Sequence, residues 1–122
     1  MTDCSNPDFK LGNMATELVD YTIGICNKDE TKTPRFPQRL YDGYVSKIVS
    51  LSIEILEGIF ATNAIHDDVD IRKKYRETVL GKCGAMAKLV FTAYKNKWIS
   101  DKQHTTWQKK INSIYFVVNK WK

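Results

Sequence analysis

The stretch "YVSKIVSLSIEILEGIFAT", residues 44–62, decides the fold class. It is rich in β-branched side chains, but it is much longer than an ordinary strand of about 5–6 residues. Its apolar side chains also recur with helical spacing, over an arc of about 200° at 100° per residue. Polar residues occupy the rest of the circumference: Ser46, Lys47, Ser50, Glu54 and Glu57. The stretch therefore predicts a long helix with a wide apolar face.

Three further helices are predicted by the same spacing, over residues 13–27, 70–96 and 100–121. The helix that contains residues 44–62 is expected to begin near Gln38 or Leu40 and to end near Asn63. Ser100 and Gln103 have the spacing of a capping box, which marks the start of the last helix. Short links between helices are typical of an antiparallel up-and-down bundle. We therefore expect an all-α four-helix bundle over residues 13–122, preceded by a flexible tail over residues 1–12.

The composition is that of one globular domain. The chain has 122 residues, of which 43% are hydrophobic and 27% charged. It has no apolar run of about 20 residues, as a membrane span requires, and residues 1–13 have no secretory segment. The three cysteines form no C-x-x-C pair and the two histidines lie far apart. We expect Cys26 and Cys83 to be core residues, and a cytoplasmic protein with no membrane association, no metal and no cofactor.

Catalytic motifs are not found in the sequence. Glu54 and Glu57 share a helix face, but the Glu-x-x-His motifs of di-metal bundles do not accompany them, which favours a solvated stripe with Lys47. The common nucleotide-binding and hydrolase motifs do not occur either. Gly81 and Gly84, in "GKCG", predict a close helix crossing. We expect that the protein is not an enzyme.

Two helices have more apolar surface than one bundle needs. Residues 70–96 also have an apolar arc of about 200°, whereas a core-facing stripe needs little more than about 100°. The surplus predicts a subunit interface, and deep burial within a monomer is the alternative. The candidate interface residues are Val49, Ile53, Phe60, Leu80, Phe91 and Phe116.

Positive charge gathers near the C-terminus. Residues 95–122 contain seven lysines and one aspartate, a balance of +6, whereas residues 1–94 have a balance of −1. On the last predicted helix, Lys102, Lys109, Ser113 and Lys120 project within about 40° of one another, with Phe116 beside them. Lysines next to an aromatic ring suit a phosphate backbone with a base stacked on the ring. A solvated lysine face, with Phe116 in a subunit contact, is the alternative.

Two arginine pairs are further candidates. Arg72 and Arg76 lie one helical turn apart and project towards an apolar arc, which indicates a position at a bundle end or an interface. One alternative is that they pair with the nearby aspartates, which are Asp67, Asp68 and Asp70. The other is that they bind a polyanion.

The second arginine pair lies in "TPRFPQR", residues 33–39. Pro34 and Pro37 fix the direction of the link and end the first helix. Arg35 and Arg39 are then expected at one end of the bundle. They are candidates for contact with RNA or a polymerase, and local capping and solvation are the alternative.

Three segments, residues 21–26, 34–44 and 98–122, carry a resemblance to a known family: "YTIGIC", "PRFPQRLYDGY" and "WISDKQHTTWQKKINSIYFVVNKWK". Their order resembles the accessory variability determinant (Avd) family of diversity-generating retroelements, over residues 14–122. The resemblance implies a basic, non-enzymatic four-helix bundle that assembles into a ring-like pentamer. It also implies association with a reverse transcriptase and with RNA or DNA during mutagenic retrohoming, in a bacterial, phage or other mobile-element setting.

The candidate nucleic-acid-binding residues come from all the basic groups above: Lys102, Lys109, Lys110, Ser113, Lys120, Arg35, Arg39, Arg72 and Arg76. The alternative is a protein-only interaction module of the related four-helix-bundle family encoded by intervening sequences in ribosomal RNA genes.

Overall fold

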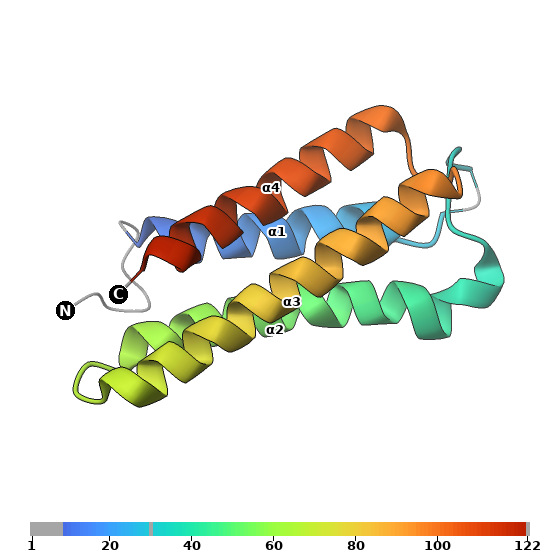
Figure 1. Ribbon diagram of the computed structural model, residues 1–122. Coiled ribbons are helices and arrows are strands. Elements are labelled where there is room, and N and C mark those ends of the chain that lie inside the picture. The colour runs from blue at the N-terminus through green and yellow to red at the C-terminus, as the bar shows by residue number, and fades with distance from the viewer. Residues whose placement is uncertain (1–8, 30, 122) are drawn as a thin grey trace.

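The computed structural model describes residues 9–29 and 31–121, and this part of the chain is helical without a strand. Four α-helices, α1 to α4, follow one another along the chain (Figure 1). Their bounds are Lys10–Cys26, Ser46–Ala64, Val69–Lys95 and Asp101–Lys120. Each helix packs on its neighbour in sequence, and α1 also packs on α4. The all-α prediction of four helices is confirmed, and the contacts close them into an up-and-down bundle.

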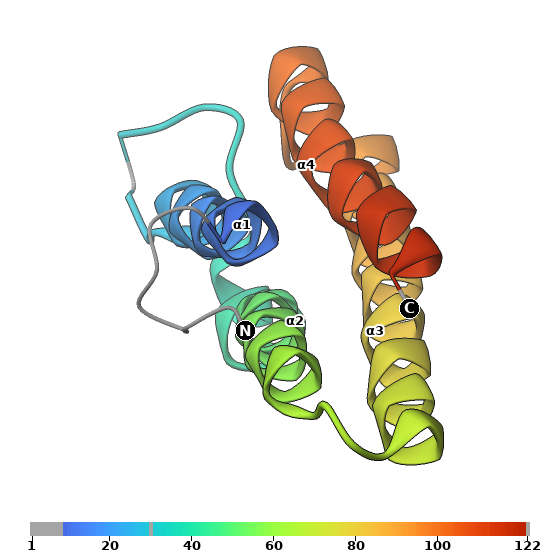
Figure 2. The ribbon, with the colours of Figure 1, turned by 90° about the vertical axis from the view of Figure 1, so that its left-hand side faces the viewer.

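The two ends of the bundle differ in construction. At the link end, residues 27–37 connect α1 to a 3-10 turn, η1 (Gln38–Leu40), and a π turn, η2 (Tyr41–Val45), which lead directly into α2. At the turn end, residues 65–68 connect α2 to α3 (Figure 1). Figure 2 looks along the bundle and shows α1 with α2 on one side and α3 with α4 on the other. The second helix was predicted to begin near Gln38 or Leu40; helical turns begin at Gln38, but the α-helix itself begins at Ser46.

The first helix begins earlier than the sequence predicts. It starts at Lys10, and both Phe9 and Leu11 are buried. The Phe9 ring meets the ring of Phe60 on α2 edge-on, with 5.4 Å between centroids. Residues 9–12 therefore belong to the bundle rather than to the expected tail over residues 1–12, of which residues 1–8 lie outside the described residues.

Helix ends are fixed by local hydrogen bonds. The predicted capping box of α4 is confirmed: Ser100 Oγ accepts from Gln103 N at 3.1 Å, and Gln103 Oε1 accepts from Ser100 N at 2.8 Å. Asp68 caps α3 by accepting from the backbone N–H of Ile71 at 3.0 Å. The end of α3 is a Schellman motif in which Lys97 has a positive φ of 63°.

The core is mainly apolar, and a polar pair joins its first and last helices. Trp107 of α4 and Thr22 of α1 are both fully buried, and the indole Nε1–H donates to Thr22 Oγ1 at 3.0 Å. The largest fully buried apolar side chains around them are Leu18, Ile48, Ile55, Ile59, Met86, Ile111 and Ile114. Cys26 and Cys83 are buried as predicted, and burial raises the pKa of each thiol to about 12.

The prediction that Gly81 and Gly84 mark a close helix crossing is wrong. A Cβ atom at either position would meet no other atom within 4 Å, since both lie on the exposed side of α3. The close approach occurs at Gly58 instead, where a Cβ atom would come within 2.5 Å of Val79 Cγ2. The missing Cβ of Gly58 therefore sets the distance between α2 and α3.

An ion pair links the same two helices. Glu54 of α2 lies 2.6 Å from the ammonium of Lys82 on α3, and this hydrogen bond is the main cause that lowers the pKa of the Glu54 carboxyl. Glu54 is thus partly exposed and pairs across helices with Lys82, and Lys47 of the predicted stripe makes a smaller contribution to the lowered pKa. Among the described residues, no helix has the length and apolar character needed to cross a bilayer.

Gly58→Ala should destabilise the protein by about 1 kcal/mol, because overpacking against the stiff Val79 side chain outweighs the better helix propensity of alanine. Gly81→Ala and Gly84→Ala are matched controls that should each stabilise by about 0.5–1 kcal/mol. Urea unfolding of the three variants measures this. Equal effects at positions 58, 81 and 84 would contradict the placement of the helix crossing.

Thr22→Val should lower the free energy of unfolding by about 1–3 kcal/mol, because it leaves a buried indole N–H without an acceptor. Thr16→Val is the control, since the Thr16 hydroxyl bonds only within its own helix, to Gly12 O, at an exposed position. It should change stability by less than about 0.5 kcal/mol. Similar losses in both variants would argue against a special role for the Trp107–Thr22 bond.

Candidate nucleic-acid interface

The predicted basic stripe lies on the outer side of α4. Lys102, Lys109, Ser113 and Lys120 are all exposed. The opposite side of α4 is buried through Trp107, Ile111, Ile114 and Val118. The burial of that side fixes the rotation of the helix and therefore directs the lysines to solvent.

Phe116 stands within this stripe, as predicted. Its side chain is 61% exposed, the highest value among the exposed aromatic side chains of the described residues. The ammonium of Lys120 lies 4.1 Å from the centroid of its ring. An exposed cation–π contact of this kind contributes about 0.5–1 kcal/mol. We call Lys102, Lys109, Ser113, Phe116 and Lys120 the α4 basic surface.

Two open grooves flank Phe116 along the seam between α1 and α4. One has a volume of about 360 Å³ and is lined by Phe9, Leu11, Phe116, Val117, Lys120 and Trp121. The other has about 500 Å³ and is lined by Met14, Lys109, Asn112, Ser113, Phe116 and Val117. No acidic side chain belongs to the described lining of either groove. Both grooves are therefore lined by apolar side chains together with a lysine of the α4 basic surface.

Lys110 is not part of the α4 basic surface. It is half-buried, and its ammonium lies 5.5 Å from the ring centroid of Tyr21 on α1. Tyr21 in turn packs edge-on against Trp107. Lys110, a candidate nucleic-acid-binding residue, therefore covers the seam between α1 and α4.

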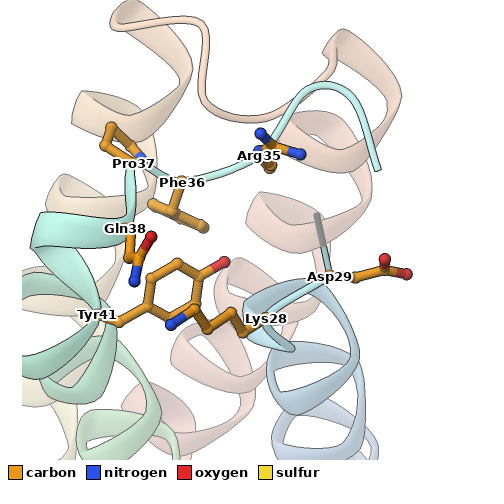
Figure 3. Close-up of a pocket in the computed structure, with 7 residues that line it drawn as sticks. All are labelled: Lys28, Asp29, Arg35, Phe36, Pro37, Gln38 and Tyr41. Atoms are coloured by element: carbon orange, nitrogen blue, oxygen red, sulfur yellow. The ribbon is translucent and has the colours of Figure 1, made fainter. Parts of the chain in front are cut away.

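Arg35 and Arg39 are exposed at the link end, as expected. Arg35 helps to line a recess of about 210 Å³, together with Lys28, Asp29, Phe36, Pro37, Gln38 and Tyr41 (Figure 3). Phe36 is buried and covers the bundle end, where its ring lies 5.9 Å from that of Trp98. Arg39 is outside the lining of this recess.

The link-end recess combines charges of both signs. The ammonium of Lys28 lies 5.8 Å from the ring centroid of Tyr41, and burial raises the pKa of that phenol. Asp29 accepts from the hydroxyl and the backbone N–H of Thr31, which lowers the pKa of its carboxyl, with smaller contributions from Lys32 and Arg35. The side chain of Asp29 points away from the other labelled residues in Figure 3.

Arg72 and Arg76 lie at the opposite, turn end of the bundle. Neither belongs to an ion pair of the described residues, so the predicted pairing with the nearby aspartates is not found. The Arg72 guanidinium lies 4.9 Å from the ring centroid of Trp121, and Arg76 Nη1 donates to the carbonyl of Trp121. The nine candidate nucleic-acid-binding residues therefore lie in four places: the α4 stripe, the α1–α4 seam, the link end and the turn end. They do not form one compact site, because α4 alone is about 30 Å long.

The six candidate interface residues differ in burial. Val49, Phe60 and Leu80 pack against the core and are half-buried, so much of their apolar surface is used within the chain. Ile53, Phe91 and Phe116 are exposed. Further exposed large hydrophobic side chains are Ile23, Val69, Ile71, Tyr75, Tyr115 and Val117.

Sequence reasoning missed the apolar partners of the α4 basic surface. Leu11 precedes the buried Ala15 by four residues, so an extension of the helical period would have placed it in α1. Trp121 was expected to be the last helical residue, but it follows the end of α4 in extended conformation and lines a groove. No signal in the sequence pairs it with Arg72 and Arg76.

The described residues contain no group of three or more histidine, cysteine, aspartate or glutamate side chains that could hold a metal ion. Comparisons of the chain with protein-family models, with curated proteins and with solved structures found no match.

Proposed function

We propose that the protein is a non-enzymatic accessory factor that binds single-stranded RNA or DNA along the α4 basic surface. The observation that carries the proposal is the exposed Phe116 ring with Lys120 at 4.1 Å, in line with Lys109 and Ser113. Phosphates would contact the lysines and an unpaired base would stack on Phe116. A base–aromatic stack contributes about 1–3 kcal/mol per base and tolerates different sequences.

The wider setting rests on the resemblance of the proline–arginine link and of the last helix to the Avd family. We infer a cytoplasmic accessory protein of a diversity-generating retroelement that holds template RNA or cDNA near the reverse transcriptase. Arg35 and Arg39 are exposed at the link end, away from Arg72 and Arg76. This leaves the link end available for the polymerase while α4 binds the strand.

Assembly into a homopentameric ring is the second part of the proposal. Ile53 on α2 and Phe91 on α3 are exposed, which supports the ring. Their burial in a subunit contact would stabilise it by about 25 cal/mol for each Å² of apolar surface removed from water. A ring would repeat the α4 basic surface and so raise the effective concentration of phosphate-binding sites for one strand.

A protein-only interaction module is the second candidate function. Ile71, Tyr75 and Tyr115 are exposed and lie outside the α4 basic surface, so they could bind a partner protein without nucleic acid. The bundle family encoded by ribosomal RNA intervening sequences represents this alternative. The two candidates differ in salt dependence, because phosphate contacts release counterions and weaken steeply as salt rises.

The combined substitution Lys102→Glu, Lys109→Glu and Lys120→Glu should abolish binding of single-stranded RNA, since it reverses the charge along the strand path. Fluorescence anisotropy over a salt series measures the affinity. In the unchanged protein, the slope of log affinity against log salt should be about −2 for three phosphate contacts. Circular dichroism should show unchanged helicity.

The control carries Lys32→Glu, Lys47→Glu and Lys74→Glu, three exposed lysines outside α4. Both triple variants change the net charge from +5 to −1. The control should retain most of the affinity. RNA binding that is independent of salt, or equal loss in the two variants, would rule out the α4 assignment.

Light scattering coupled to size exclusion at high salt should give about five times the 14.1 kDa chain mass. Ile53→Glu and Phe91→Glu should shift the mass towards that of a monomer, because each places a charge in the proposed subunit contact. The control Val69→Glu, at an exposed turn-end position, should leave the mass unchanged. A monomer at all concentrations would refute the ring.

A further inference from the structure

Three cationic side chains meet at the turn end of the bundle. Arg72, Lys73 and Arg76 line a recess of about 400 Å³ together with His66, Val69 and Trp121, which we call the end recess. This is within the usual range of small-molecule sites, about 300–1,000 Å³. No acidic side chain belongs to its described lining.

Trp121 holds both arginines in place. The Arg72 guanidinium lies 4.9 Å from the centroid of its ring, and its carbonyl accepts from Arg76 Nη1. The Nε–H of Arg76 is buried and has no hydrogen-bond partner among the described residues. A buried guanidinium donor is ordinarily paired, and an anion with several oxygens is the partner that suits it best.

The acidic side chains that are closest in sequence lie outside the described lining of the recess. Asp68 is occupied as the cap of α3, through the N–H of Ile71. The only ion pair of the described residues near the recess joins Lys73 to Glu77 at 3.9 Å, and both side chains are about 60% exposed, so the pair is weak. The described lining of the recess therefore contains three cationic side chains and no acidic one, and Asp67 and Asp70 are close in sequence but outside this lining.

We propose that the end recess binds a phosphomonoester. The ammonium of Lys73 and the guanidinium of Arg72 balance the charge, and the apolar body lies against Val69 and Trp121. The Nε–H of Arg76, which is buried in this structure, donates to one phosphate oxygen after the guanidinium turns towards the ligand. Three cations without an acid favour a phosphomonoester, with a charge of about −1.5 to −2, over a carboxylate.

Two sources offer this group, a free nucleotide and the 5′-phosphorylated end of a strand. The α4 basic surface ends at Lys120, next to Trp121 in the chain, so a strand bound along α4 would bring its end to the recess. The strand source rests on the proposed function, whereas the nucleotide source does not.

The experiment uses the full chain and three probes: thymidine 5′-monophosphate, and decathymidylate with either a 5′-phosphate or a 5′-hydroxyl group. The ¹H–¹⁵N resonance of Arg76 Nε reports directly on the unpaired donor. We expect it to shift on addition of millimolar thymidine monophosphate. We also expect the phosphorylated strand to bind about fivefold or more tightly than the hydroxyl strand.

Two substitutions locate the effect. Arg76→Lys keeps the charge but removes the Nε–H donor, and Lys73→Gln removes an exposed cation without disturbing the fold. Arg76→Lys has no Nε resonance, so its readout is the strand affinity, and it should lose the preference for the phosphorylated strand. Lys73→Gln should reduce both this preference and the Arg76 shift with thymidine monophosphate, whereas the exposed control Lys74→Gln should retain both. The Lys102, Lys109 and Lys120 triple variant should lose the hydroxyl strand but keep the Arg76 shift.

The probes distinguish failure of strand binding on the α4 basic surface from failure of phosphomonoester binding in the end recess. An Arg76 shift without strand preference supports phosphomonoester binding and assigns the free nucleotide as its source. No Arg76 shift together with equal affinity for the two strands would overturn the proposal. A strand preference that persists in both Arg76→Lys and Lys73→Gln would also overturn it, since the phosphate would then bind elsewhere.

Discussion

The hydrogen bond from Trp107 to Thr22 is the interaction on which the rest of the bundle depends. It joins the first and last helices across 85 positions of sequence, and both of its side chains are fully buried. A buried donor restricts the alternatives far more than an apolar contact, because a shift of one turn would leave it unpaired. The bond therefore fixes both the register and the rotation of α4 against α1.

That rotation decides which side chains the outside of α4 presents. With Trp107, Ile111 and Ile114 inside, the lysines and Phe116 are directed to solvent, and the α1–α4 seam supplies the apolar grooves beside them. The same geometry brings Trp121 to the turn end, where it meets Arg72 and Arg76. The proposed strand path and the end recess are consequences of one packing arrangement.

Local rules predicted the helices well where the signal lies within a few residues. The Ser100–Gln103 capping box and the wide apolar arc of residues 44–62 are local patterns, and both were correct. The start of α1 was placed late because Phe9 gains its burial from Phe60, about fifty positions away. The glycines were misassigned for the same reason. A side chain at position 58 would collide with Val79 on another helix, whereas Gly81 and Gly84 are exposed to solvent.

The sequence by itself determined that the chain is all-helical, that α4 has one apolar and one basic side, and that Phe116 stands beside the lysines. Helical periodicity depends only on 3.6 residues per turn, so it can be read without knowledge of neighbours. Tertiary structure alone decided that Lys110 covers Tyr21, that Glu54 pairs with Lys82, and that Trp121 holds two arginines. These contacts join residues distant in sequence, and their partners follow from how the helices pack rather than from any local spacing.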